Sequence, residues 1–121
     1  MLFRSHYNLY VSFPKAQISA TSKFGWWKDA SNEILVSTTT ASVSTWYHVA
    51  YVRSGTSFNL YVNGILESTV TNSDSFNFSG WTIGRGYYDN QFNGYIDDFR
   101  ITKGVARYTA PFTPPTAALL K

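Results

Sequence analysis

Apolar and polar residues alternate at every second position through much of this chain, most clearly over Trp81–Arg85 and Gly94–Thr102. This period predicts β-strands with one face in a core and the other toward solvent. In the second segment one face is apolar apart from an aspartate, and we expect that face to be buried: Tyr95, Asp97, Phe99 and Ile101. A carboxylate buried there would need hydrogen-bond donors, a cation or a metal ion, because burying it unpaired costs several kcal/mol.

The segment Trp46–Arg53 is apolar on both of its faces, which predicts an inner strand covered on both sides. After it, Phe58–Val62 and Ile65–Thr71 flank the dipeptide Asn63-Gly64. Both residues of that dipeptide tolerate the positive φ of a type I′ turn, so the pattern predicts a tight hairpin. Shorter strands are expected at Tyr7–Phe13, Ala16–Ala20, Lys23–Lys28 and Glu33–Thr38, and a single helical turn at Gly104–Tyr108.

The chain contains no heptad pattern, no amphipathic helix and no internal repeat. Many short strands with regular turn signals predict an all-β protein, an antiparallel β-sandwich of the jelly-roll type. We expect one domain at residues 1–110, followed by a Pro-rich extended tail at 111–121. Hydrophobic residues make up 44% and charged residues 14% of the sequence, which excludes a disordered chain.

Composition also narrows the classes of partner. The net charge is +3, but the basic residues are scattered singly, whereas nucleic-acid binders usually carry a basic stripe, so no nucleic-acid partner is expected. No apolar run approaches the roughly 20 residues of a membrane-spanning helix, so no membrane partner is expected either. The first residues lack the apolar segment and cleavage site of a signal peptide. The absence of cysteine excludes disulfides and cysteine-ligated metal sites.

Four motifs occur in order: WYHVAYVRSG, FNLYVNGILES, WTIGR and FNGYIDDFRITKGVARYTAPFTPP. Together they resemble laminin-G-like jelly-roll domains of the concanavalin A-like lectin/glucanase superfamily, over Trp46 to about Thr116. The ending RITKGVARYT resembles a variant common in structural proteins of tailed phages. Two initial strands that such domains usually carry have no counterpart here, so the resemblance implies a shortened domain. Because an exposed sheet edge tends to be paired or covered, we expect a homo-oligomer or a larger virion assembly.

The acidic residues argue against catalysis. A glycosidase needs two carboxylates on either side of the sugar bond, and glucanases of the resembled superfamily carry them in an E-x-D-x-x-E pattern that is absent here. The adjacent Asp97 and Asp98 point to opposite faces of a strand and cannot act as a pair. His48 lies on a Trp/Ala/Val face and is expected to be a structural histidine with its hydrogen bonds satisfied. We therefore predict a protein that is not an enzyme.

A carbohydrate site is the leading candidate for function. Aromatic faces stack on pyranose rings and polar side chains bind their hydroxyls, commonly on loops over a rigid sandwich. The loop RGYYDNQFN has this composition, and Trp26 or Trp27 would add a second platform. The alternative is that the loop tyrosines cover the edge of the core or a subunit contact. The candidate residues are Trp26, Trp27, Arg85, Tyr87, Tyr88, Asp89, Asn90 and Gln91.

A structural Ca²⁺ is the remaining alternative. The resembled domains often hold one, and Asp97 would be a ligand, but Ca²⁺ needs six to eight oxygen ligands. We instead expect Asp97 to accept backbone N–H groups or to pair with an arginine, with no cofactor bound. The expected partner is a glycan or cell-surface polysaccharide, and the expected location is extracellular or on a virion surface. The rival role is purely structural, as an oligomerisation or capsid and tail decoration domain.

Overall fold

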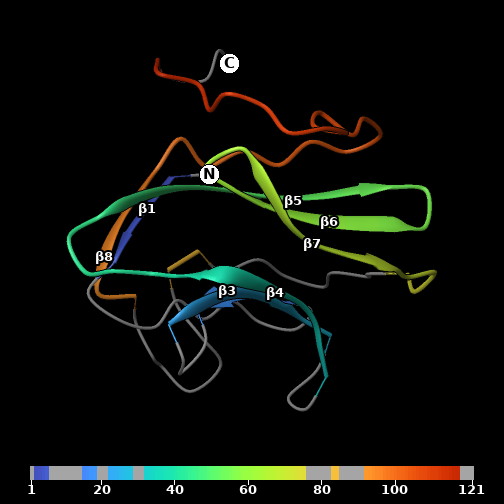
Figure 1. Ribbon diagram of the computed structural model, residues 1–121, viewed down its shortest axis with the longest axis horizontal. Helices are drawn as coiled ribbons and strands as arrows, with labels where there is room; N and C mark the ends of the chain where they lie inside the picture. The colour runs from blue at the N-terminus through green and yellow to red at the C-terminus, as the bar shows by residue number, and fades with distance from the viewer. Residues whose placement is uncertain are drawn as a thin grey trace.

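The protein folds into two antiparallel sheets that lie face to face (Figure 1). The computed structural model describes residues 2–5, 15–18, 22–28, 32–75, 83–84 and 92–117, the first two ranges as backbone. These residues form the strands β1 (Leu2–Ser5), β2 (Lys15–Ile18), β3 (Lys23–Trp27), β4 (Glu33–Thr40), β5 (Trp46–Ser54), β6 (Ser57–Val62), β7 (Ile65–Thr71) and β8 (Gly94–Asp97). One sheet has the order β7-β6-β5-β1-β8 and the other β2-β3-β4. The predicted all-β sandwich class is confirmed.

The β6–β7 hairpin turns at the predicted dipeptide. Asn63 and Gly64 have φ values of 50° and 80°, as a type I′ turn requires. The Asn63 side chain also accepts the backbone N–H of His48 at 2.9 Å, and its own N–H donates to the His48 carbonyl at 2.8 Å. The turn is therefore fastened to β5 by hydrogen bonds to the backbone of a single residue.

The core lies between the two sheets. Strands β5 and β6 pair in register from Val49–Val62 to Ser54–Ser57, which places Val49, Leu60 and Val62 on the same inner face. Phe24 and Leu35 reach the same cluster from the three-stranded sheet. Each such side chain contributes about 1.5–3 kcal/mol by leaving water, so this cluster supplies much of the folding energy.

Residues 98–117 form a third layer over the outer face of the five-stranded sheet, opposite the three-stranded sheet (Figure 1). The rings of Tyr108 and Phe112 stack with their centroids 3.6 Å apart. Phe112 also lies against His48 at 5.4 Å and Tyr61 at 5.6 Å. Strand β5 is thus covered on both faces along most of its length, as its two apolar faces predicted. None of the described residues forms a helix, so the helical turn expected at Gly104–Tyr108 is wrong.

One strand prediction needs correction. β8 ends at Asp97, short of the expected Thr102, because Asp98 adopts a left-handed backbone with φ of 49°. The buried face is also the opposite one: Ile96 packs against the core, whereas Tyr95 is exposed. Alternation identified the strand but could not tell which face the protein covers. At Trp81–Arg85 the described part, residues 83–84, is a bend rather than a strand.

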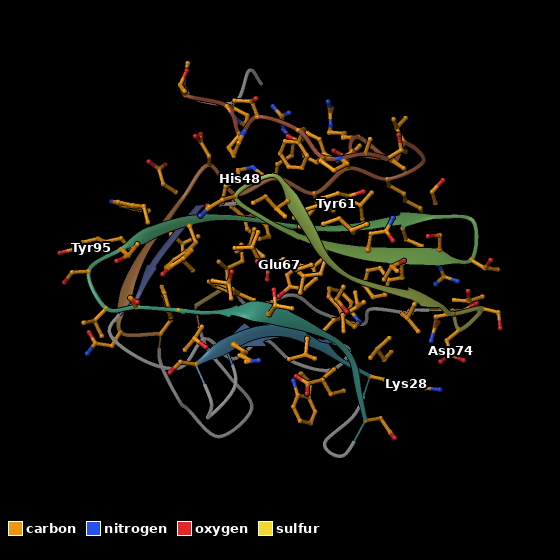
Figure 2. All side chains as sticks on the ribbon, in the orientation of Figure 1. Lys28, His48, Tyr61, Glu67, Asp74 and Tyr95 are labelled. Carbon is orange, nitrogen blue, oxygen red and sulfur yellow. The ribbon has the colours of Figure 1, made fainter. Side chains whose placement is uncertain are left out.

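Two side chains, those of Ser37 and Glu67, make hydrogen bonds with backbone groups along β3 and β4. Register between β3 and β4 shifts around Phe24, and there the buried Ser37 hydroxyl accepts the Phe24 N–H at 3.0 Å and donates to the Thr39 carbonyl at 2.6 Å. Glu67 of β7 reaches across from the other sheet and accepts the Thr39 backbone N–H at 3.0 Å and its hydroxyl. Figure 2 shows Glu67 between the two sheets. The Glu67 carboxylate thus links β7 to β4, two strands that belong to different sheets and share no backbone hydrogen bonds.

Candidate functional site

The two adjacent tryptophans of β3 point to opposite faces of the three-stranded sheet, as expected for neighbouring strand residues. Trp26 packs on the inner side, with its ring centroid 5.4 Å from Tyr51 and 5.2 Å from Phe58. Its ring is therefore occupied by core aromatics, and Trp26 is removed from the set of sugar platforms. Trp27 lies half-buried on the outer side and keeps its place in that set.

Trp27 and Glu33 lie together over Gly25. The two residues are register partners on β3 and β4. A Cβ atom at Gly25 would lie 2.5 Å from Glu33 Oε1 and 3.3 Å from Trp27 Nε1, so only glycine leaves room for both groups. From the inner side, the Tyr51 hydroxyl donates to the Gly25 carbonyl at 2.9 Å and holds this backbone in place. The result is an indole beside a carboxylate on a fixed sheet surface.

The Glu33 carboxyl is shielded by its neighbours even though the residue as a whole is exposed. This desolvation raises its pKa above the usual value, while the Trp27 indole N–H and the charge of Lys23 act in the opposite direction. Near neutral pH such a group can accept hydrogen bonds from hydroxyls, and the adjacent indole offers an apolar surface. This combination of an aromatic surface and an acceptor is suited to a sugar ring.

The candidate loop residues lie outside the described residues: Arg85, Tyr87, Tyr88, Asp89, Asn90 and Gln91. The two ends of the loop are described. The Phe92 N–H donates to the Gly84 carbonyl at 2.8 Å, which closes the loop at its base. Gly84 has a φ of 75°, and Phe92 packs against the core. The two ends of the loop are therefore joined to each other, and Phe92 holds them against the core. That the loop binds sugar stays a prediction.

Asp97 is exposed rather than buried among aromatics. Its Oδ1 accepts the backbone N–H of Asp98 at 2.8 Å, so the expectation of a backbone partner is confirmed, although for a carboxylate at the surface. Among the described residues, no three His, Asp or Glu side chains gather in a way that could hold a metal ion. The geometry thus gives the calcium alternative no further carboxylate ligands in this part of the chain.

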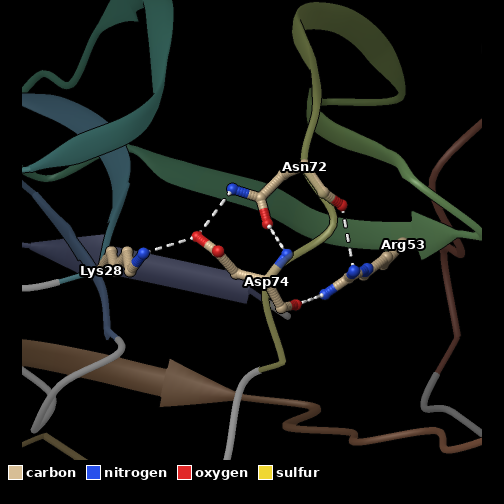
Figure 3. Close-up of polar contacts among 4 residues, drawn as sticks. All are labelled: Lys28, Arg53, Asn72 and Asp74. Atoms are coloured by element: carbon tan, nitrogen blue, oxygen red, sulfur yellow. Dashed lines mark hydrogen bonds and ion pairs between the residues drawn. The ribbon is translucent and has the colours of Figure 1, made fainter.

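Asp74 belongs to a polar cluster that fixes the chain after β7 (Figure 3). Its carboxylate lies 2.8 Å from Lys28 Nζ and 3.3 Å from Asn72 Nδ2. These contacts lower the Asp74 pKa, with the Lys28 contact the largest cause. Arg53 donates to the carbonyls of Asn72, at 3.0 Å, and Asp74. The cluster links β5 to the end of β3 and has a structural role.

His48 is only 6% exposed and is covered by the third layer. The edges of its ring meet Phe112 and Tyr108, the latter with centroids 6.1 Å apart. Within the described part of the chain its Nδ1 has no hydrogen-bond partner, so the expectation of a fully satisfied histidine is wrong, while its buried structural setting is confirmed. Its pKa is lowered to about 4, mainly because burial disfavours the charged imidazolium; the positive amino terminus also lowers the pKa, and Asp98 acts in the opposite direction.

Three aromatic residues that alternation places on covered strand faces are exposed: Trp46, Tyr95 and Phe99. Trp46 is 40% and Tyr95 65% exposed, and both lie on the outer face of the five-stranded sheet. Trp46 was assigned to a covered face, and Tyr95 to the core. The signal that could have placed Tyr95 outside is its neighbour Ile96, an equally good core residue on the alternate face.

Comparison with known proteins agrees with this architecture. A laminin-G family model, described as the concanavalin A-like lectin/glucanases superfamily, matches residues 3–107. The chain therefore belongs to that superfamily. No curated protein and no solved structure matches it. The match extends well to the N-terminal side of Trp46, where the motif-based resemblance began. None of the described residues forms a helix long and apolar enough to cross a membrane.

Proposed function

We propose that this member of the concanavalin A-like lectin/glucanase superfamily is a carbohydrate-binding module without catalytic activity. The observation that carries the proposal is the family match over residues 3–107, most of the chain. The superfamily joins lectins, which bind carbohydrate, and glucanases, which hydrolyse it. The described surface supports this with a tryptophan and a carboxylate side by side at Trp27 and Glu33.

The carboxylates favour binding over hydrolysis. Glycosidic hydrolysis requires a pair of carboxyl groups on either side of the bond, one of them acting as an acid. Three described acidic residues are engaged in local structure: Glu67 with Thr39, Asp74 with Lys28, and Asp97 with the following backbone N–H. Glu33 lies beside the Trp27 indole, and the positive charge of Lys23 acts on it from farther along β3. This arrangement supports recognition of hydroxyl groups rather than proton transfer to a leaving group.

In the proposed complex a pyranose ring lies on Trp27, and its hydroxyls donate to Glu33. The loop from Arg85 to Gln91 contributes further stacking and hydrogen bonds through Tyr87 and Tyr88. Each such contact is individually weak, so an assembly of several copies would raise the avidity. We therefore include in the proposal a homo-oligomer displayed outside the cell or on the surface of a phage-like particle, with cell-surface polysaccharide as its partner.

A glycan array probed with the purified chain tests the proposal. We expect the protein to bind at least one polysaccharide, and Trp27→Ala to reduce that binding about tenfold or more. Ile65→Ala removes an exposed apolar side chain from the other sheet and is the control, which should bind normally. Tyr88→Ala tests separately whether the loop from Arg85 to Gln91 contributes to glycan binding. An intact, folded protein that binds no glycan on the array would contradict the proposal and leave the structural role.

A further inference from the structure

Trp46 and Tyr95 lie in one row on the outer face of the five-stranded sheet. Strand β1 runs between β5 and β8, and its Arg4 pairs with Trp46 on one side and with Tyr95 on the other. The two aromatic residues are therefore at the same level, two strands apart. Two interstrand spacings correspond to about 10 Å. Figure 2 shows Tyr95 at the margin of the molecule, away from the space between the sheets.

Neither ring stacks on another aromatic ring within the described residues. Trp46 is 40% and Tyr95 65% exposed, and neither makes a ring contact or a side-chain hydrogen bond within the described part of the chain. Elsewhere on this face the opposite holds. Two residues further along β5, His48 lies beneath Tyr108 and Phe112 of the third layer. Within the described residues, aromatic rings of the third layer cover the β5–β6 part of this outer face, and none of them contacts Trp46 or Tyr95.

From this geometry we infer that the row is a second carbohydrate site, which binds an extended chain of pyranoses running across the strands. The inference rests on the proposed carbohydrate-binding function and assigns it a site distinct from Trp27. Aromatic rings held by separate strands stack on flat apolar surfaces, and a pyranose presents such a surface through its C–H groups. The backbones that carry the two rings are about 10 Å apart by ideal strand spacing, which is close to the distance between alternate rings of an extended sugar chain. Two rings of a trisaccharide would stack on Trp46 and Tyr95, and the middle ring would lie over β1 at Arg4, which the register places on the same face.

The ligand class follows from the same spacing. A monosaccharide can contact one platform only, so it gains nothing from the second. A trisaccharide contacts both, and longer chains add no further platform in the row. Affinity should therefore rise from the monosaccharide to the trisaccharide and then level off. Extended β-linked chains satisfy this geometry, whereas branched or helical glycans do not.

The test uses titration calorimetry with β-1,4-linked oligomers of glucose and of N-acetylglucosamine, from the monosaccharide to the hexasaccharide. We expect one series to gain about tenfold or more in affinity up to the trisaccharide and little beyond it. Trp46→Ala and Tyr95→Ala should each return the trisaccharide to the affinity of the monosaccharide. Tyr95→Phe keeps the ring and should retain binding. Val105→Ala, which removes an equally exposed apolar side chain outside the row, is the matched control.

The outcomes separate the two proposals. If the wild-type protein binds oligosaccharides and only Trp27→Ala weakens binding, the row is not a site and the carbohydrate function stands. If neither series binds, and the glycan array is also negative, both proposals fail. If Trp46→Ala and Tyr95→Ala instead lower the oligomeric state measured by light scattering and leave sugar binding unchanged, the row is an interface between copies of this chain. Thermal unfolding of each variant confirms that the fold is retained.

Discussion

The backbone N–H of Phe112 donates to the carbonyl of Gly64 at 2.9 Å, which joins the C-terminal segment to the tip of the β6–β7 hairpin. A Cβ atom at residue 64 would lie 1.7 Å from the Phe112 carbonyl oxygen and 3.2 Å from Pro114. Gly64 also has a φ of 80°. One glycine thus satisfies two requirements, the geometry of the turn and the close approach of a segment almost fifty residues later in the chain.

We expect Gly64→Ala to destabilise the protein by at least about 2 kcal/mol, because it combines backbone strain with a clash against the third layer. The C-terminal segment should also detach, so limited proteolysis should cleave it faster than in the wild type. Urea unfolding and mass spectrometry of the proteolytic fragments measure the two effects.

Gly55→Ala is the control that separates the backbone strain of a positive φ from the clash with the third layer. Gly55 has a φ of 58°, and nothing lies within 4 Å of a Cβ atom placed there. This variant should lose about 1 kcal/mol and keep the protease resistance of its C-terminal segment. Equal proteolysis of the two variants would show that Gly64 does not hold the third layer.

A second prediction concerns pH. The pKa of His48 falls from 6.5 in the unfolded chain to about 4 in the folded protein. Between these two values the unfolded state binds more protons, so stability decreases as the pH falls from about 6.5 to about 4 and does not change further through this group. Burial of the uncharged imidazole beneath Tyr108 and Phe112 is the physical cause, and the loss is up to a few kcal/mol.

The variant His48→Phe keeps a ring in contact with Tyr108 and Phe112 but cannot be protonated. Its stability should fall less than that of the wild type over the same pH window, with the difference measured by urea unfolding at several pH values. Carboxyl groups titrate in both proteins, so the difference between them isolates His48. Identical pH profiles would mean that the imidazole is not held uncharged by burial.

A third prediction concerns the carboxylate between the sheets. Glu67→Ala leaves the Thr39 backbone N–H and hydroxyl without their acceptor and should cost about 1–3 kcal/mol. Glu67→Gln retains one acceptor oxygen and should cost less. Thermal or urea unfolding measures both.

Thr39→Val removes the hydroxyl contact and leaves the backbone contact in place. In a double-mutant cycle, Thr39→Val and Glu67→Ala should show a coupling energy of about 0.5 kcal/mol or more. Strictly additive effects would indicate that the two side chains act independently and that Glu67 does not join the sheets through Thr39.

Much of the fold could be predicted from local patterns. The all-β class, the Asn63-Gly64 turn and the double-sided burial of β5 follow from period-two alternation and from the φ preferences of two residues. The opposite orientations of Trp26 and Trp27 follow from strand geometry alone. These features depend on residues that are neighbours in the sequence, where physical preferences are strong.

The choice of buried face could not be predicted in this way. Tyr95 and Ile96 are both suitable core residues, and only the position of the opposite sheet decided that Ile96 is covered. Likewise, Trp26 became a core residue because Tyr51 and Phe58 meet it there. Each of these contacts joins segments far apart in the chain, so the sequence pattern carries no record of them.

By itself, the sequence determined that the chain forms short β-strands, that a tight turn lies at Asn63-Gly64, and which family the chain belongs to. Tertiary structure alone decided which aromatic rings are exposed at the surface. Trp46 and Tyr95 become a pair only because β1, from the beginning of the chain, inserts between β5 and β8. The pairing of strands remote in sequence sets which side chains share a surface, and a binding surface is a property of that pairing.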